Sequence, residues 1–367
     1  MVRILFIGES WQGSSARSMR EGLAKQPQVI LSDIATDHFL PNYRDLPLRI
    51  ANRMLRGLQV KELERAILGA MKGFHPDAIV IYKGPEIGAG LLKEFRRLGI
   101  PAINVFPDYS PHAFGGQLQQ AMSCYDLVIS TKPFHPLQWQ SVYGYQNPCV
   151  CVPHGYDPEV HYWGDPAPGE VYDVALCANW RPEYHRLMQS FADALRDDQV
   201  SVAIAGSGWE RNRDQLPRHW HYAGPKTGRH YGDFLRSAKI AVAPVNRDVV
   251  VRGVRQPGDE DTTRTYELAA AYCFFLHQRT DFVATVYDER SEVPLWDDAT
   301  ELANLVRRWL PDDAGRQLMA ARAHQRAVSA YSIPQRAASV LQYIEHLIET
   351  RKHQANTPSR THVYSQI

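Results

Sequence analysis

Short apolar runs alternate along this chain with stretches of helical periodicity, and that alternation limits the folds open to it. The first run, Val2–Ile7, is nearly continuous and ends at Gly8, as expected of a strand buried on both faces. A helical pattern follows at Ala16–Lys25, and a second apolar run follows at Val29–Ile34. This β–α–β order predicts parallel strands with helices on both faces of the sheet, and hence an α/β protein.

The pattern runs to about residue 153 and then starts again, which predicts two domains of the Rossmann-like kind. The remaining strand candidates are Ala78–Tyr82, Ala102–Phe106, Leu127–Thr131 and Cys149–Pro153 in the first half, and Val171–Ala178, Val202–Ala205, Ile240–Pro244 and Cys273–Leu276 in the second. The turn formers of Pro153–Pro158 mark the boundary and can serve as a hinge. We therefore expect domains at 1–152 and 153–334, an amphipathic helix at 335–350, and a disordered tail at 351–367.

The composition is that of an ordinary globular protein and argues against several classes. Lys and Arg number 41 and Asp and Glu number 40, so no net charge favours a nucleic-acid partner. The five cysteines form no Cys-x-x-Cys pair, which argues against structural zinc. No apolar run approaches the ~18 residues of a membrane span, and Val2–Ile7 is shorter than the apolar core of a signal peptide. We expect a reduced, cytoplasmic protein.

The richest stretch for function is residues 258–267, where an acidic turn runs into a helix start. Asp261, Thr262 and Thr263 all favour the N-cap position, so unpaired backbone N–H groups should point out of this helix end. Such an end binds phosphate, and Arg264 in the first turn adds a forked cation. An alternative interpretation is an ordinary capped surface helix with an internal ion pair.

Carboxylates surround this helix start. Glu267 lies one turn into the helix and can accept both hydroxyls of a ribose, whereas Asp259 or Glu260 can hold sugar hydroxyls. Phosphate donors and hydroxyl acceptors in one short segment indicate a site for a nucleotide sugar.

Four stretches of the second half carry a resemblance to a known family. They are a strand and turn at 152–157, a strand and loop at 173–181, a Gly-x-Gly-Trp element within 202–209, and Arg-x-Tyr-Glu at 264–267. In order and spacing they resemble the group 1 glycosyltransferases, and within them the spore-maturation-type branch. The resemblance covers about residues 150–345. Asp259 stands where the family usually has the first Glu of a pair separated by seven residues.

The resemblance implies the glycosyltransferase B (GT-B) fold, with two Rossmann-like domains facing a central cleft. It implies a donor that leaves as a nucleoside diphosphate, stabilised by cations and helix ends without a metal or other cofactor. The diphosphate candidates are Arg181, Thr263, Arg264 and Lys226, with Gly206 and Gly208 as a nucleotide loop and His154 beside the donor sugar. For Gly206 and Gly208 a simple turn is the alternative, and for Arg181 and Lys226 a solvated charge. The last helix, 335–350, should cross back to the first domain.

The acceptor should bind at the carboxyl edge of the first sheet. The loop after the first strand supplies Glu9, Ser10 and Ser14 as one wall. Asp108 and His112 follow a later strand, and one of them would be the general base if the reaction inverts the anomeric centre. Asp108 as a turn cap and His112 as a loop histidine without chemical role are the alternatives.

The expected partners are a nucleotide-sugar donor and a hydroxyl acceptor on a glycan, a protein or a small molecule. The basic stretch Arg44–Lys61, interleaved with apolar residues, suggests contact with an anionic membrane, or simply a solvated helix with an apolar core face. Two other functions stay open: a nucleotide-sugar epimerase or hydrolase on the same fold, and a non-catalytic protein that binds nucleotides or glycans.

Overall fold

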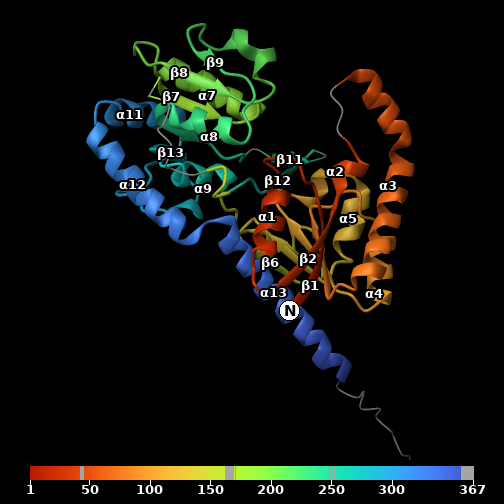
Figure 1. Ribbon diagram of the computed structural model, residues 1–367. Helices are drawn as coiled ribbons and strands as arrows, with labels where there is room; N and C mark the ends of the chain where they lie inside the picture. Colours follow the sequence, from red (N-terminus) through yellow and green to blue (C-terminus); the bar gives the residue numbers. More distant parts are fainter. Residues whose placement is uncertain (42–44, 162–168, 170, 248, 252, 357–367) are drawn as a thin grey trace, which may run out of the picture.

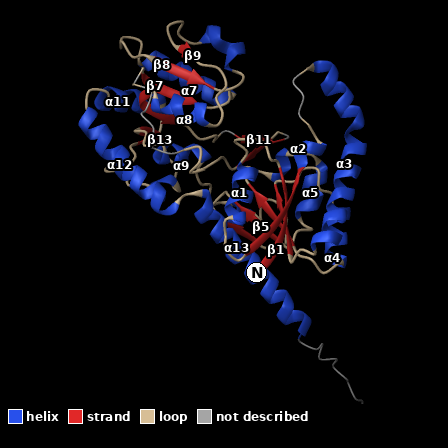
Figure 2. Cartoon of the chain, viewed as in Figure 1, coloured by secondary structure: helices blue, strands red, loops and turns tan. Residues whose placement is uncertain are grey.

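The computed structural model describes residues 1–41, 45–161, 169, 171–247, 249–251 and 253–356, and it shows two α/β domains side by side (Figure 1). The strands of each domain form a central sheet with helices on both faces (Figure 2). All strand pairs within the two main sheets are parallel, as the alternating sequence pattern predicts.

The first domain is built on a sheet in the order β2-β1-β3-β4-β5-β6. Its elements are β1 (Val2–Gly8), α1 (Ser15–Ala24), β2 (Val29–Ala35), α2 (Thr36–Phe39), α3 (Leu46–Phe74), β3 (Ala78–Tyr82), α4 (Ala89–Arg97), β4 (Ala102–Phe106), η1 (Pro111–Ala113), α5 (Gly116–Met122), β5 (Leu127–Ser130), α6 (His135–Gln138) and β6 (Cys149–Cys151). The chain order reverses direction between β1 and β3, which creates a crevice at the carboxyl ends of these strands.

The second domain repeats the plan with a sheet in the order β14-β13-β10-β7-β8-β9. Its elements are β7 (Tyr172–Cys177), α7 (Pro182–Ala194), β8 (Val202–Ala205), η2 (Trp209–Gln215), β9 (His221–Tyr222), α8 (Arg229–Arg236), β10 (Ala238–Ala243), the hairpin β11 (Val249–Val251) and β12 (Val254–Gln256), α9 (Thr263–Ala270), β13 (Phe275–Gln278), α10 (Val283–Val286), β14 (Leu295–Trp296), α11 (Ala299–Trp309), α12 (Asp313–Ala330) and α13 (Ile333–Asn356). Here the order reverses between β7 and β10.

Each sheet has an apolar core on both faces, since its strands are nearly continuous runs of buried aliphatic residues. The helix α12 and the first turns of α3 are among the helical segments that the sequence did not predict. The helix α12 packs through small residues, among them Ala320, Ala323 and Ala327, and so has little apolar periodicity. The first turns of α3 carry no buried apolar side chain, because its buried residues begin at Leu63.

The last helix leaves the second domain and packs on the first one (Figure 1). Its buried residues Ala337, Leu341 and Ile344 join Phe6 of β1 and Met19 of α1 in one core cluster. The two chain segments that cross between the domains, the hinge and the residues before α13, are joined by backbone hydrogen bonds. Figure 1 shows α13 running diagonally from the second domain past β1 and β2.

At the crossing, Tyr156 N–H donates to the Tyr331 carbonyl at 3.1 Å, and Ile333 N–H donates to the Tyr156 carbonyl at 2.9 Å. A side chain at position 155 would not fit, because a Cβ there would lie 2.6 Å from the Tyr331 carbonyl oxygen. Gly155 in the hinge therefore allows the backbone of the hinge to lie directly against the backbone before α13.

The end of α13 corrects one prediction. Residues 351–356, which the sequence suggested as part of a disordered tail, continue the helix. Arg351 forms an ion pair with Asp126 of the first domain, and this contact helps to hold the extra turns. Residues 357–367 lie outside the described residues. No helix in the described part of the chain is both long and apolar enough to cross a membrane.

Candidate active site

A cavity of about 390 Å³ lies between the two domains, where the crevices of both sheets face each other. We call it the interdomain cavity. It is lined by Glu9, Trp11, Gly13, Ser14, Ser15 and Ser18 from the first domain, by Gly155, Asp157, Val160, His161 and Ile333 from the crossing segments, and by Cys177, Ala178, Asn179, Gly206, Lys226, Thr227, Gly228, Tyr231, Thr263, Arg264 and Glu267 from the second domain. Carboxyl ends of β1 and β7 thus meet at one place, as expected for ligand sites in open parallel sheets.

The start of α9 forms one wall of this cavity. Thr262 is the N-cap residue, and its backbone N–H donates to Thr265 Oγ1 at 3.1 Å. The N–H groups of Thr263 and Arg264 belong to the first turn, where the helix itself provides no acceptor. Both residues line the cavity, so this helix end offers it backbone donors and the positive end of the helix dipole.

Arg264 is held by the second domain. Its Nη2 donates to the Pro244 carbonyl at 2.8 Å and to the Tyr184 hydroxyl at 3.2 Å, and its guanidinium lies over the Tyr184 ring. These contacts fix the orientation of the guanidinium while the residue still lines the cavity. Lys226 lines it as well and forms no ion pair with the residues that the structure describes. The wall therefore carries two cations.

Glu267 faces the same space one turn further along α9. The Tyr231 hydroxyl donates to its Oε2 at 2.7 Å, and His161 Nε2 lies 3.7 Å from its Oε1. Burial and the neighbouring carboxylate raise the pKa of Tyr231 well above its ordinary value, so Tyr231 stays protonated and donates. Glu267 is thereby oriented by Tyr231 and His161, which no local sequence pattern links to it.

The loop after β8 approaches the cavity through glycine. Gly206 has φ 129°, and a Cβ there would lie 2.0 Å from the Ala178 carbonyl oxygen. No other residue fits this backbone, which lets the loop pack directly against the end of β7. Gly206 lines the cavity, whereas Gly208 is not among the lining residues, and a Cβ there would lie 3.0 Å from Trp180 Cβ.

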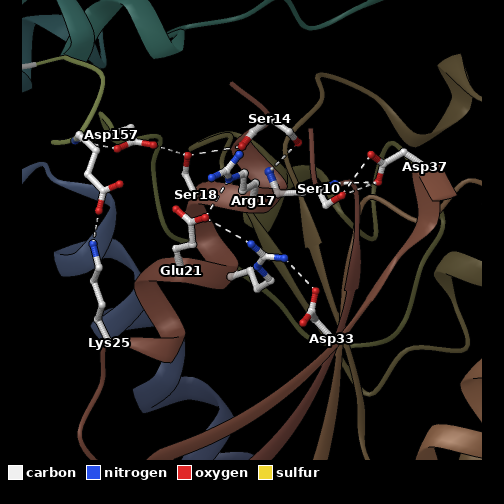
Figure 3. A network of polar contacts seen from close by, with 12 residues as sticks. Ser10, Ser14, Arg17, Ser18, Glu21, Lys25, Asp33, Asp37 and Asp157 are labelled. Atoms are coloured by element: carbon white, nitrogen blue, oxygen red, sulfur yellow. Dashed lines mark hydrogen bonds and ion pairs between the residues drawn. The ribbon is translucent and has the colours of Figure 1, made fainter. Parts of the chain in front are cut away.

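The opposite wall is the start of α1. Ser14 is its N-cap and accepts from the Ala16 N–H at 3.2 Å. One turn later, Ser18 Oγ donates to Asp157 Oδ2 of the hinge at 2.7 Å, as Figure 3 shows. A second contact, between Lys25 and Glu159 at 2.6 Å, also joins α1 to the segment after the hinge. A second helix start therefore faces the cavity and is tied to the crossing point.

A second cavity, of about 600 Å³, adjoins the first and lies within the first domain. We call it the first-domain cavity. Glu9, Trp11, Ser14 and Ser15 line both cavities. The further residues are Ala16, Thr36, Asp37, Leu40, Pro41, Asn52, Arg56, Tyr82, Lys83, Pro85, Glu86, Pro107, Asp108, Phe114 and His154.

Its charged groups are partly paired. Asp108 Oδ2 lies 2.9 Å from Lys83 Nζ, and Lys83 also lies over the Phe114 ring. Burial raises the pKa of Glu86 and that of Tyr82. The first-domain cavity therefore carries both acidic and basic side chains.

Several predicted residues lie elsewhere. Ser10 lines neither cavity, because its N–H and hydroxyl bond to Asp37 (Figure 3). His112 packs edge-on against Tyr143 and also lines neither. Arg181 precedes α7, with the Asn246 side chain 3.3 Å from its Nη1, outside the set that lines the interdomain cavity. His154 belongs to the first-domain cavity, where burial and nearby cations hold its pKa well below its usual range.

Asp259 and Glu260 are not brought together with Glu267. Both line a separate depression of about 450 Å³. Asp259 Oδ1 instead lies 2.8 Å from Nζ of the buried Lys132, which follows β5 in the first domain. Lys132 Nζ also reaches the Asp261 carbonyl oxygen at 3.3 Å and His154 Nε2 at 3.2 Å. The acidic turn before α9 thus binds the other domain through Lys132.

The structure also brings in residues that sequence reasoning missed, chiefly Ser18, Asp157, His161, Tyr231 and Lys132. Only Asp157 lies in a motif that the sequence singled out. In the described part of the chain, no group of three or more His, Cys, Asp or Glu side chains is arranged to hold a metal ion.

Comparison with known proteins shows which family model and which solved structures this chain resembles. Residues 181–342 match a family model described as glycosyl transferase-like. Sucrose-phosphate synthase from Thermosynechococcus elongatus is similar in structure, with a TM-score of 0.67 and 14% identity, over 95% of this chain and 100% of that one. Anabaena Alr3699/HepE, in a complex with UDP and glucose, has a TM-score of 0.65 and 12% identity, over 94% and 100%.

A glycosyltransferase from Rickettsia africae has a TM-score of 0.62 and 9% identity, over 95% of this chain and 99% of that one. No curated protein sequence matches the chain. The two facing parallel sheets are those of the predicted GT-B fold. The match of residues 181–342 to the glycosyl transferase-like family model confirms the predicted class of enzyme, a glycosyltransferase.

Proposed function

We propose that the protein transfers a sugar from a nucleoside diphosphate donor in the interdomain cavity to a hydroxyl acceptor in the adjoining first-domain cavity. The observation that carries this proposal is the convergence of two helix starts, those of α1 and α9, on one cavity that also holds Arg264 and Lys226. Backbone donors from both domains and cations from the second one suit a diphosphate, which carries its charge over several oxygens.

The remaining donor groups have separate tasks. Glu267 accepts the ribose hydroxyls, held in orientation by Tyr231 and His161. Because Anabaena Alr3699/HepE contains UDP, a uridine nucleotide is the first donor class to test. We infer the spore-maturation-type branch from the four sequence motifs alone.

In the reaction, the acceptor oxygen forms a bond to the anomeric carbon as the bond from that carbon to the diphosphate oxygen breaks. Negative charge grows on the diphosphate, and Arg264, Lys226 and the start of α9 lie where they can stabilise it without a metal. If the reaction inverts the anomeric centre, Asp108 is better placed than His112 to take the acceptor proton, because Asp108 lines the first-domain cavity. If configuration is retained, the leaving diphosphate takes that proton.

Nucleotide binding and donor turnover test the proposal. UDP, GDP and ADP are titrated by calorimetry and by thermal unfolding, where ligand at 100 times its dissociation constant adds about 2.7 kcal/mol. One of them should bind and stabilise the protein, with affinity that depends on Glu267. A protein that binds none of the nucleoside diphosphates would contradict the proposal.

The alternative of an epimerase or hydrolase is separated by incubation with donor alone. Those enzymes convert the donor fully without an acceptor, whereas a transferase should turn it over much faster once a hydroxyl acceptor is present.

A further inference from the structure

The first turns of α3 form a projecting arm, defined here as residues 46–58. In Figure 1 this end of the orange helix extends past α2, away from the body of the first domain. The buried residues of α3 are Leu63, Ile67 and Met71, so the domain core begins after the arm.

Large apolar side chains are exposed on this arm. Leu46, Ile50, Met54 and Leu58 are exposed by 65%, 55%, 81% and 66%, and Leu48 and Leu55 are also exposed. No other segment of the described chain gathers as many exposed large apolar residues. Single exposed apolar residues are ordinary, but a contiguous group on one short segment marks an interaction surface.

Helical geometry sorts these residues onto one side. At ~100° per residue, Leu46, Ile50, Met54 and Leu58 form a stripe at i, i+4 spacing, and the six apolar residues span an arc of roughly 200°. Arg49, Arg53 and Arg56 fall together on the remaining arc, beyond the apolar residues. The arm is therefore amphipathic, with an apolar side and a basic side.

Polar contacts fix the side of the arm that faces the domain. Asn52 Nδ2 donates to the Pro41 carbonyl at 2.8 Å, and Gln59 Nε2 donates to Asn52 Oδ1 at 2.7 Å. Both residues lie on the narrow arc between the apolar side and the arginines. The apolar stripe accordingly points away from the domain.

The positive charge of the arm indicates a negatively charged partner. From Leu46 to Lys61 the chain has Arg49, Arg53, Arg56 and Lys61 and no Asp or Glu. The molecule as a whole has a formal net charge of only +1, so this local charge is a feature of the arm. A helix with basic residues beside an exposed apolar side is the arrangement that lies in the interface of an anionic lipid bilayer.

We propose that residues 46–58 bind the surface of an anionic membrane, with the apolar stripe inserted among the lipids and the arginines on the headgroups. Asn52 and Arg56 also line the first-domain cavity, so the docked arm holds that cavity beside the lipid surface. That the cavity then receives a membrane-borne acceptor rests on the proposed function, whereas the docking itself does not.

The test is flotation of the full chain with phosphatidylcholine vesicles, with and without phosphatidylglycerol. We expect binding to the anionic vesicles, weak binding to the neutral ones, and loss of binding at high salt. Arg49→Gln with Arg53→Gln should weaken anionic binding about fivefold per charge removed. Met54→Ser with Leu58→Ser should weaken it at least tenfold.

Matched controls lie far from the arm in sequence. Leu137→Ser with Leu318→Ser removes exposed apolar side chains, and Arg211→Gln with Arg290→Gln removes exposed charges. These variants should float like the parent protein, and all variants should keep the melting temperature and nucleotide affinity of the parent.

Three outcomes overturn the proposal. One is an absence of binding to anionic vesicles, and another is equal loss in the controls. The third is a dimer in light scattering that only the arm variants disrupt, because the apolar stripe then binds a second copy of the chain. Failure of nucleotide binding alone would count against the proposed function and leave the docking intact.

Discussion

Glu267 and Arg264 show how single residues of α9 are prepared for a ligand by contacts from elsewhere in the fold. Glu267 accepts from Tyr231, and Arg264 donates to Tyr184 and Pro244. Neither side chain has to search for its orientation when a ligand arrives, which lowers the entropic cost of binding. Substitution of either residue should therefore have a clear effect on ligand binding or turnover.

Replacing Glu267 with Gln should weaken nucleotide binding by roughly 1.5–3 kcal/mol, because the amide has one uncharged acceptor where the carboxylate has two charged ones. Calorimetry with the nucleotide that binds best measures this change. The control is Glu349→Gln on the exposed side of α13, which should leave affinity unchanged. An unaltered affinity in Glu267→Gln would remove this residue from the ribose site.

Arg264→Ala should lower turnover by a factor on the order of 100 to 1,000, more than it lowers donor affinity, because its charge acts on the leaving diphosphate. Arg264→Lys should recover little, since an ammonium has no planar fork that can meet diphosphate oxygens while Nη2 is held by Pro244 and Tyr184. Steady-state kinetics that separate kcat from KM decide the matter, and full activity in either variant would contradict this role.

At the scale of elements, the site depends on how closely loops approach strand ends. Gly206 is the tightest example, because its backbone lies against Ala178 at the end of β7. Gly206→Ala should destabilise the second domain by on the order of 3 kcal/mol, from the clash and the positive φ together. Gly224→Ala is the matched control, since its φ is 72° but a Cβ there meets nothing within 4 Å. Urea unfolding compares the two, and equal losses would show that the clash contributes nothing.

Across the whole molecule, the two domains are joined by the crossing segments, by α13, and by the ion pair of the buried Lys132 with the partly buried Asp259. Lys132→Met leaves Asp259 without its partner and should cost roughly 3–5 kcal/mol. The double variant Lys132→Met with Asp259→Asn should recover part of that loss. A double-mutant cycle by thermal unfolding measures the coupling, and strictly additive effects would mean that the pair does not join the domains.

Buried histidines should make the folded molecule sensitive to acid. Burial lowers the pKa of His135 to about 3 and that of His277 to about 4, and it holds the pKa of His154 well below its usual range. The unfolded chain therefore binds more protons below about pH 6.5, and stability falls as the pH drops through that value. Each histidine should contribute a loss on the order of 2 kcal/mol between pH 7 and pH 5.

Asp261 acts in the opposite direction, because burial raises its pKa to about 6. Its folded form binds a proton that the unfolded chain lacks between about pH 4 and pH 6, so stability falls as the pH rises through that window. Its gain of about 1 kcal/mol between pH 7 and pH 5 is smaller than the summed losses of the histidines. Melting temperature against pH should therefore decline towards pH 5, and a rise would contradict the balance.

Local sequence patterns predict the repeated parallel sheets and the capped start of α9. Both are local properties: buried parallel strands need continuous apolar runs, and a helix start needs its cap residues within a few positions. The Arg264–Glu267 spacing places both side chains on one helix wall for the same reason.

Which distant groups meet around the interdomain cavity follows from the tertiary fold. Ser18 bonds Asp157 across 139 residues of sequence, and no spacing rule relates them. The acidic residues beside α9 show the same limit. The sequence suggested Asp259 or Glu260 for sugar contact, yet the structure pairs Asp259 with Lys132 of the other domain, whose Nζ lies 2.8 Å from Asp259 Oδ1. Pairings of this kind depend on the relative placement of two sheets, which apolar periodicity along one strand or helix does not encode.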